Sequence, residues 1–499
     1  MTEFDVLIVG SGISGIGSAC HLKMDAPWAS FAVLEGRERL GGTWDLFRYP
    51  GIRSDSDMHT LGFRFKPWKH ERAIADAPSI LDYLNETAKE YQIESHIRYD
   101  SPVRRAEWDS GTARWTVTVA KGDGATEQLR CRFLHMCTGY YSYTNPYIPH
   151  WGGEESFKGI MFHPQFWPEG LDYQGKKIVV IGSGATAATI VPAMAAQGAG
   201  HVTMLQRSPT YFVSRPAKDA IANFLRRWLP GGLAYRMTRW KNITLQQFFY
   251  GQTQKRPEKA KAKLLEMVTK ELPEGYDVAT HFTPRYNPWE QRLCLVPDAD
   301  FFTAIKAGKA TVVTDHIERI TETGLVLKSG RALDADIIVV ATGLNMEIMS
   351  GVDLVVDGVA RHVSQSFSYK GSMYSDIPNL ASTFGYSNAS WTLKADLISQ
   401  FVCRLLNHMK ASGTDFCVPV AAGVAEDSAG MMNLTSGYVE RARDKVPRMG
   451  DVYPWRAYHD YKIDKKLMLD TALDDGWMQF RKAAVAKETP EVEYAEAAE

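Results

Sequence analysis

The chain has 499 residues, of which 45% are hydrophobic and 23% are charged, and its formal net charge at pH 7 is -1. This length predicts two or more domains, and the balanced charge excludes the basic excess of a nucleic-acid-binding protein. The six cysteines form no CxxC pair, which argues against a disulfide framework or a zinc site, so we expect no metal. We expect a cytoplasmic protein with no secretory signal and no transmembrane segment.

The first predicted elements form a dinucleotide-binding turn. The stretch FDVLIVGSGISGIGSAC predicts a buried strand, a glycine turn and the start of a helix, with Gly10, Gly12 and Gly15 in the pattern G-x-G-x-x-G. Such a turn lets a pyrophosphate approach the amides of a helix N-terminus. The next strand, SFAVLE, ends at Glu35, where a carboxylate accepts hydrogen bonds from a free ribose 2′-hydroxyl. This arrangement favours the ADP half of FAD.

A second turn follows the same plan. After the strand KIVVI, Gly182, Gly184 and Ala187 form G-x-G-x-x-A. Arg207 stands 25 residues after the first glycine of its motif, as Glu35 does in the first copy. An arginine at this place pairs with a 2′-phosphate, so the second turn favours NADPH.

The remaining elements connect and enclose these two turns. Two predicted strands end in Thr-Gly, at 138–139 and 342–343, and resemble the crossings between domains in flavoproteins that bind two dinucleotides. Residues 215–297 predict a helical insertion whose aromatic residues favour a buried core, with a membrane-surface role as the alternative. An amphipathic helix is expected from about Thr392, and the acidic end KETPEVEYAEAAE predicts a disordered tail.

These elements together predict an α/β fold with two dinucleotide-binding Rossmann-like domains and a helical insertion in the second. The expected division is 1–145 for the first part of an FAD domain, 146–176 for a linker, 177–334 for an NADPH domain, 335–470 for the second part of the FAD domain and 471–499 for a C-terminal tail.

One stretch of the linker carries a family fingerprint. FKGIMFHPQFWP matches the pattern F-x-G-x-x-x-H-x-x-x-W-P at Phe157, Gly159, His163, Trp167 and Pro168. It resembles the fingerprint of type I Baeyer–Villiger monooxygenases. The stretch LGGTWDLFRYPGIRSDSD resembles the flavin-contacting loop of that family. The chain to about residue 470 is similar to the family, and the residues of its motifs most resemble those of the ethionamide-activating branch found in mycobacteria.

The resemblance implies an FAD-dependent enzyme that uses NADPH and O2 to convert ketones to esters or lactones, with sulfide oxidation as a side activity. It places the active-site arginine of the family at Arg292, as a stabiliser of negative charge, with Asp55 as the partner that orients it. Two departures bear on this. Gln291 replaces a lysine that many members carry as a second 2′-phosphate contact, and Asp45-Leu46 replaces an aromatic pair.

The resemblance also implies cofactor contacts. For FAD they are Gly10, Gly12, Ser14, Gly15, Glu35, Thr43, Trp44, Asp45, Asp55 and Val103. For NADP they are Arg53, Ser54, Asp55, Gly182, Ser183, Gly184, Ala185, Thr186, Ala187, Arg207 and Ser208.

Other functions remain open at this point. A monooxygenase that oxidises sulfur or nitrogen is the nearest alternative, and the Trp167-Pro168 ending together with Arg292 argues against it as the main activity. A disulfide reductase would need a CxxC pair, which the sequence lacks. A non-catalytic flavin-binding module would leave Arg207 and Arg292 unexplained. The sequence leaves the identity of the substrate and the oligomeric state open.

Overall fold

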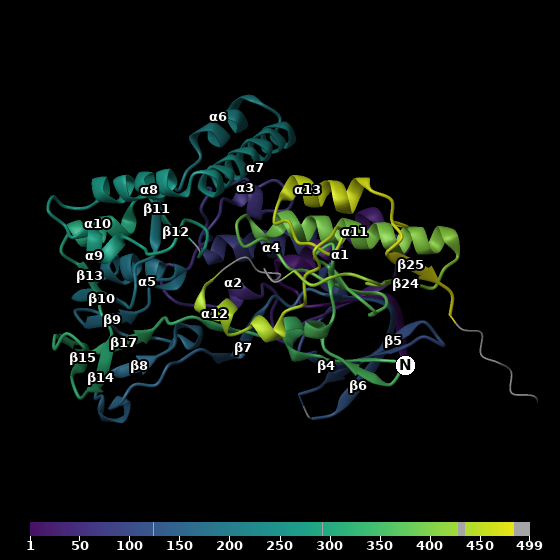
Figure 1. Ribbon diagram of the computed structural model, residues 1–499, viewed down its shortest axis with the longest axis horizontal. Coiled ribbons are helices and arrows are strands. Elements are labelled where there is room, and N and C mark those ends of the chain that lie inside the picture. The colour runs from purple at the N-terminus through teal and green to yellow at the C-terminus, as the bar shows by residue number, and fades with distance from the viewer. Residues whose placement is uncertain (123, 292, 428–434, 484–499) are drawn as a thin grey trace, which may run out of the picture.

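The computed structural model describes residues 1–122, 124–291, 293–427 and 435–483. It contains two sheets with parallel cores. One strand of each sheet leads into a glycine turn and a helix, as the α/β prediction required. In Figure 1 the first sheet lies at the right, near the N-terminus, and the second lies at the left.

The first sheet is centred on β1 (Thr2–Val9), which runs parallel to β2 (Phe31–Leu34) on one side and to β6 (Thr126–Met136) on the other. The strand order is β20-β19-β4-β5-β6-β1-β2-β3, and β23 also pairs with β6. The last four residues of β1 are all buried, because layers of structure cover both faces of this core. The other strands are β3 (Ile97–Arg98), β4 (Val103–Asp109), β5 (Arg114–Ala120), β19 (Asp353–Val356), β20 (Val359–Arg361) and β23 (Leu380–Ser382).

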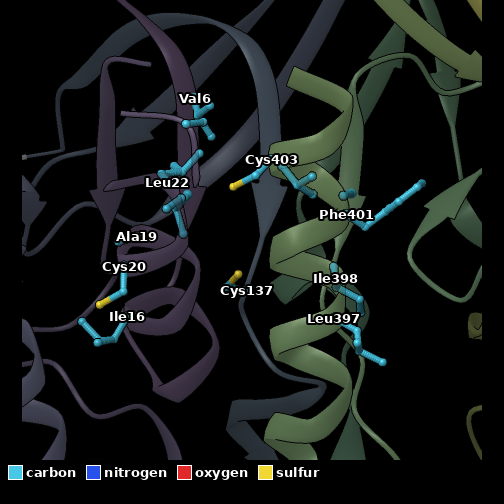
Figure 2. Close-up of a cluster of buried hydrophobic side chains, with 14 of the residues drawn as sticks. Val6, Ile16, Ala19, Cys20, Leu22, Cys137, Leu397, Ile398, Phe401 and Cys403 are labelled. Atoms are coloured by element: carbon cyan, nitrogen blue, oxygen red, sulfur yellow. The ribbon is translucent and has the colours of Figure 1, made fainter. Parts of the chain in front are cut away.

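Two long helices cover one face of this sheet. α1 (Ile13–Asp25) follows the first glycine turn, and α11 (Trp391–Ser412) is the amphipathic helix that we expected from about Thr392. Figure 2 shows apolar side chains of α1, β1 and α11 that belong to one buried cluster, among them Ile16, Leu22, Leu397 and Phe401. The other helices of this part are α2 (Thr43–Leu46), α3 (Met58–Leu61), α4 (Ala77–Glu90), α12 (Gly437–Glu440) and α13 (Tyr461–Lys465).

The second sheet has the order β13-β10-β9-β17-β8, and all its strands are parallel. The second glycine turn of the chain belongs to this sheet and joins β9 (Lys177–Ile181) to α5 (Ala185–Ala196). The other strands are β8 (Ile160–Phe162), β10 (His201–Gln206), β13 (Ala310–Thr314) and β17 (Ile337–Val340), and an antiparallel unit of β14 (Ile317–Thr321), β15 (Gly324–Leu327) and β16 (Ala332–Asp334) lies beside them.

Two expected boundaries are wrong in detail. We assigned residues from 335 to the returning first domain, but β17 pairs with β8 and β9 and is a strand of the second sheet. The return crossing therefore lies after residue 340. We also treated 146–176 as a linker, but β8, inside the fingerprint, is the edge strand of the second sheet. Between the domains, β7 (Tyr141–Pro146) of the outward crossing pairs with β18 (Leu344–Met346) of the return.

The helical insertion lies between two short parallel strands, β11 (Tyr211–Arg215) and β12 (Leu293–Pro297), which match its predicted ends. Its helices are α6 (Ala220–Trp228), α7 (Gly231–Lys255), α8 (Pro257–Glu271) and α9 (Val278–Phe282), and α10 (Asp300–Lys306) follows β12. Figure 1 shows α6 and the start of α7 projecting from the body.

The predicted start of the C-terminal tail, residue 471, is too early in the chain. β25 (Met478–Arg481) pairs antiparallel with β24 (Phe416–Pro419), and Leu473 and Met478 are buried in the core beneath α11. Residues 471–483 are therefore part of the first domain. The acidic stretch from 487 onward lies outside the described residues.

Candidate functional site

The three glycines of the first turn meet different packing demands. Gly10 has φ +101°, and a Cβ there would lie 2.6 Å from the carbonyl oxygen of Cys137. A Cβ on Gly15 would lie 1.8 Å from the Gly10 carbonyl oxygen. The protein's own backbone therefore requires a glycine at both positions. Gly12 caps α1 in extended backbone, and a Cβ there would make an ordinary 3.5 Å contact with Gly42. Since the fold does not require a glycine at residue 12, this position fits the close approach of a pyrophosphate.

The second turn repeats this division of roles. Gly182 has φ +135°, and a Cβ there would lie 2.2 Å from the carbonyl oxygen of Ala341. Gly184 caps α5, and within the described parts of the chain no atom beyond its chain neighbours and its own helix lies within 4 Å of the position its Cβ would take. Ala187 is buried one turn into α5. The remaining predicted contacts of this turn, Ser183, Ala185 and Thr186, lie at its open end beside Gly184.

The acid at the end of β2 is held by the first turn. Glu35 is buried, and its Oε2 accepts hydrogen bonds from the backbone N–H and the hydroxyl of Ser11, both at 2.8 Å. Its Oε1 accepts from the N–H of Arg37 at 3.0 Å. A carboxylate has about four acceptor positions, so these bonds orient Glu35 and leave room for a ribose hydroxyl.

The corresponding residue of the second domain has the opposite charge. Arg207 follows β10 directly and is exposed, and it makes no ion pair with any residue in the described ranges. Ser208, next to it, accepts a hydrogen bond at its carbonyl oxygen from the Ser183 hydroxyl at 3.3 Å. This bond ties the arginine's loop to the second glycine turn. The two turns therefore present an acid and an arginine at equivalent places, as the sequence predicted.

Within the predicted flavin loop, the carboxylate of Asp45 is the centre of a cluster of charges. It is buried, and it pairs with Arg37 at 2.6 Å, Arg48 at 3.0 Å and Arg39 at 3.4 Å. The residue that replaces an aromatic side chain in this sequence thus binds arginines from both sides of the loop. Its predicted contact with FAD stays a prediction.

The same loop reaches the second domain. Tyr49 is half-buried against the core of the second domain, and desolvation raises the pKa of its phenol to about 12, with Thr186 of the second turn acting on it in the opposite direction. Gly51 has φ +76°, and a Cβ there would lie 2.6 Å from the Cβ of Ala193 on α5. The loop therefore contacts both dinucleotide turns, and the predicted NADP contacts Arg53, Ser54 and Asp55 lie at its end.

Those three predicted contacts lie just beyond Gly51. Arg53 forms an ion pair with Asp300 at the start of α10, with Nη2 at 3.3 Å from Oδ1. Ser54 is buried and its hydroxyl accepts from the N–H of Ala75. Asp55 is exposed, and its charge acts on the Tyr49 phenol. Arg292, its expected partner, lies outside the described residues.

The other predicted FAD contacts lie around the first turn. Thr43 is exposed at the start of α2, Trp44 packs against the core of the first domain, and Val103 is buried as the first residue of β4. The sequence missed Trp391, whose indole N–H donates to the hydroxyl of Ser14 at 2.7 Å. This bond fixes the start of α11 on the first turn.

The fingerprint histidine joins the two crossings. His163 is buried, and its Nδ1 accepts from the backbone N–H of Gln165 at 3.1 Å, so Nε2 carries the proton and donates to the carbonyl oxygen of Gly343 at 3.0 Å. Burial lowers the pKa of His163, which keeps the ring neutral. Gln165 in turn donates to the carbonyl oxygen of Ser142 at 3.0 Å. The fingerprint therefore bonds to the outward and return crossings at once.

The other fingerprint residues shape this junction. Gly159 lies against β17, since a Cβ there would be 2.3 Å from the carbonyl oxygen of Asp336 and 2.5 Å from the ring of Phe157. Trp167 packs edge-on against Phe162 of β8, with ring centroids 5.0 Å apart, and Pro168 follows it. These contacts fix the fingerprint on the edge of the second sheet.

Comparisons with known proteins agree with this architecture. The sequence matches the flavin-binding monooxygenase-like family over residues 70–367 and an NAD(P)-binding Rossmann-like domain over residues 8–76. It is 53% identical over 483 residues to the FAD-containing monooxygenase EthA of Mycobacterium tuberculosis, covering 97% of this chain and 99% of that protein. It is 48% identical over 482 residues to the probable FAD-binding monooxygenase AlmA of Acinetobacter baylyi, covering 96% of each.

Solved structures show the same fold. An oxidized steroid monooxygenase bound to NADP superposes with a TM-score of 0.78 at 22% identity, covering 96% of this chain and all of that one. An open structure of cyclohexanone monooxygenase gives 0.73 at 19% identity, covering 97% and 100%. The resemblance to flavoprotein monooxygenases, and to their mycobacterial branch, is thereby confirmed. This chain belongs to the flavin-binding monooxygenase-like family.

Proposed function

We propose that this protein is an FAD-dependent monooxygenase that uses NADPH and O2 to convert ketones to esters or lactones, with sulfide oxidation as a side activity. The observation that carries the proposal is the complete fingerprint from Phe157 to Pro168, including its Trp-Pro ending. Its histidine bonds to the return crossing at Gly343, and its Gln165 bonds to the outward crossing. A segment in this position is suited to couple events at the two dinucleotide sites.

The two turns fit different dinucleotides. Gly12 and Gly184 leave room for a pyrophosphate at the starts of α1 and α5, respectively. Glu35 suits the free ribose hydroxyl of FAD, and the exposed Arg207 suits the 2′-phosphate of NADPH. When bound, FAD supplies the redox chemistry that activates O2. Because Gln291 replaces a second cationic contact, the preference for NADPH depends mainly on Arg207.

The chain's own residues must orient the cofactors and stabilise charge. Inserting an oxygen beside a carbonyl develops negative charge on oxygen, which a fixed cation in a water-poor site stabilises. Arg292 would supply that cation, since a guanidinium stays charged and offers several donors. Asp55 would orient it from the flavin loop. Tyr49, through Thr186, and Arg53, through Asp300, would hold that loop against the second domain.

A screen of substrates tests the proposal. The purified protein loaded with FAD is given NADPH, O2 and a series of linear, cyclic and aryl ketones and of sulfides, and NADPH consumption and products are measured together. Ketone-stimulated consumption that yields esters or lactones supports the proposal. Sulfoxides as the sole products would assign a heteroatom monooxygenase, and NADPH consumption that no substrate stimulates would favour a non-catalytic flavin-binding module.

A further inference from the structure

The hairpin of α6 and α7 exposes large apolar side chains on its outer face. On α6 these are Ile221, Phe224 and Trp228, of which the last two are 62% and 68% exposed. On the first half of α7 they are Leu233, Met237 and Trp240, the last 71% exposed. Their spacing of three or four residues places each set on one side of its helix. The sequence-based expectation that these aromatic residues form core is therefore wrong for the outer face of the hairpin.

The inner face of the hairpin is firmly attached to the body. Arg239 is buried and its Nη1 donates to the carbonyl oxygens of His59, Thr60 and Gly62, at 2.8–3.2 Å. The hydroxyl of Tyr235 donates to the carbonyl oxygen of Phe63 at 2.8 Å. The hairpin therefore has a fixed orientation. Figure 1 shows that it projects from the body, and the apolar side chains of its outer face are exposed.

All charged residues of the hairpin are basic. Residues 220–257 contain no Asp or Glu and seven Lys or Arg. Two of these, Arg227 and Arg236, are exposed among the apolar side chains of the outer face. Tryptophan with arginine on a projecting amphipathic helix is the composition of a segment that lies in the headgroup region of a bilayer.

We propose that the outer face of the α6–α7 hairpin docks on a lipid surface that carries anionic headgroups. Over the ranges that the structure describes, no helix is long and apolar enough to cross a membrane, so the hairpin would lie in the interface. A second copy of this chain fits the face less well. A symmetric dimer through the hairpin would bury Arg227 and Arg236 of both copies in one interface, with no acid in residues 220–257 to pair with them.

Vesicle flotation with the full FAD-loaded chain tests this proposal. The protein should float with vesicles of phosphatidylcholine mixed with phosphatidylglycerol and much less with vesicles of phosphatidylcholine alone. The double variant Trp228→Ser/Trp240→Ser should bind at least about tenfold more weakly, because binding scales with the apolar area that is buried. The double variant Arg227→Glu/Arg236→Glu should lose about fivefold or more per arginine. Val359→Ser, an exposed apolar residue on β20, is the matched control and should bind like wild type.

Each result bears on the proposal. Far-UV circular dichroism and flavin content show that the variants are folded, since the substituted side chains are exposed. Equal flotation of wild type and both hairpin variants would overturn the proposal, as would no binding to the anionic vesicles. If analytical ultracentrifugation showed an oligomer that dissociates in the tryptophan variant while wild type fails to float, the face would instead be an interface between copies.

Discussion

Replacing His163 with alanine should weaken the junction between the domains by an amount that the structure sets. The ring donates to the Gly343 carbonyl oxygen and accepts from the Gln165 N–H, at 3.0 and 3.1 Å, inside a buried site. Alanine leaves both backbone groups without that partner, and each unsatisfied buried group costs about 1–3 kcal/mol. Because water can enter the space that the ring leaves, we expect the free energy of unfolding to fall by about 2–4 kcal/mol.

Thermal unfolding followed by circular dichroism and by release of flavin fluorescence measures this loss. In a chain of this size, a loss of 2–4 kcal/mol corresponds to a decrease in Tm of about 2–4 °C, on the order of 1 °C per kcal/mol. His150→Ala is the matched control, because His150 is exposed on the same segment and should leave Tm unchanged. The junction variant should also release more hydrogen peroxide per NADPH consumed. A Tm within about 1 °C of wild type would show that the two hydrogen bonds do not stabilise the junction.

Four further predictions follow from the site and its surroundings. Arg207→Ala should raise the KM for NADPH far more than the KM for NADH, because it removes about 1.5–3 kcal/mol of binding free energy to the 2′-phosphate. Equal increases in the two KM values would refute this pairing. Gly12→Val should abolish FAD retention, measured by absorbance after purification, and a fully yellow variant would contradict the pyrophosphate assignment. Burial lowers the pKa of His135 to about 3, so below about pH 6.5 the unfolded chain binds a proton that the folded chain does not. Urea unfolding should therefore show a free energy that falls by about 4 kcal/mol between pH 6.5 and 3, with a shallower fall in His135→Gln. Arg292→Ala should keep FAD and its reduction by NADPH but lose ester formation roughly 100-fold, and unchanged ester formation would make Arg292 a structural residue.

The sequence predicted the parts of the site whose signals are local. Each glycine turn follows its strand directly, and Glu35 and Arg207 lie at a fixed distance along the chain from their turns, so spacing alone placed them. The start of α11 was also predicted to within one residue, because turn residues precede a regular apolar period.

What the sequence missed depends on contacts between distant segments. Parallel pairing of β8 with β17 joins residues far apart along the chain, and a short apolar strand does not reveal its partner. The bond between Trp391 and Ser14 spans 377 residues, and neither residue type signals it. The three arginines around Asp45 were not predicted either, because their positions depend on the path of the loop.

The proposed reaction requires that the oxygen inserted beside a ketone carbonyl comes from O2, with NADPH as the reductant. Mass spectrometry of the product formed under isotopically labelled O2 tests it most directly, with a ketone that stimulates NADPH consumption. We expect an ester or lactone that contains a single labelled oxygen atom, formed in equal amount to the NADPH consumed. A product without the label, or consumption of NADPH that yields hydrogen peroxide and unchanged ketone, would contradict it.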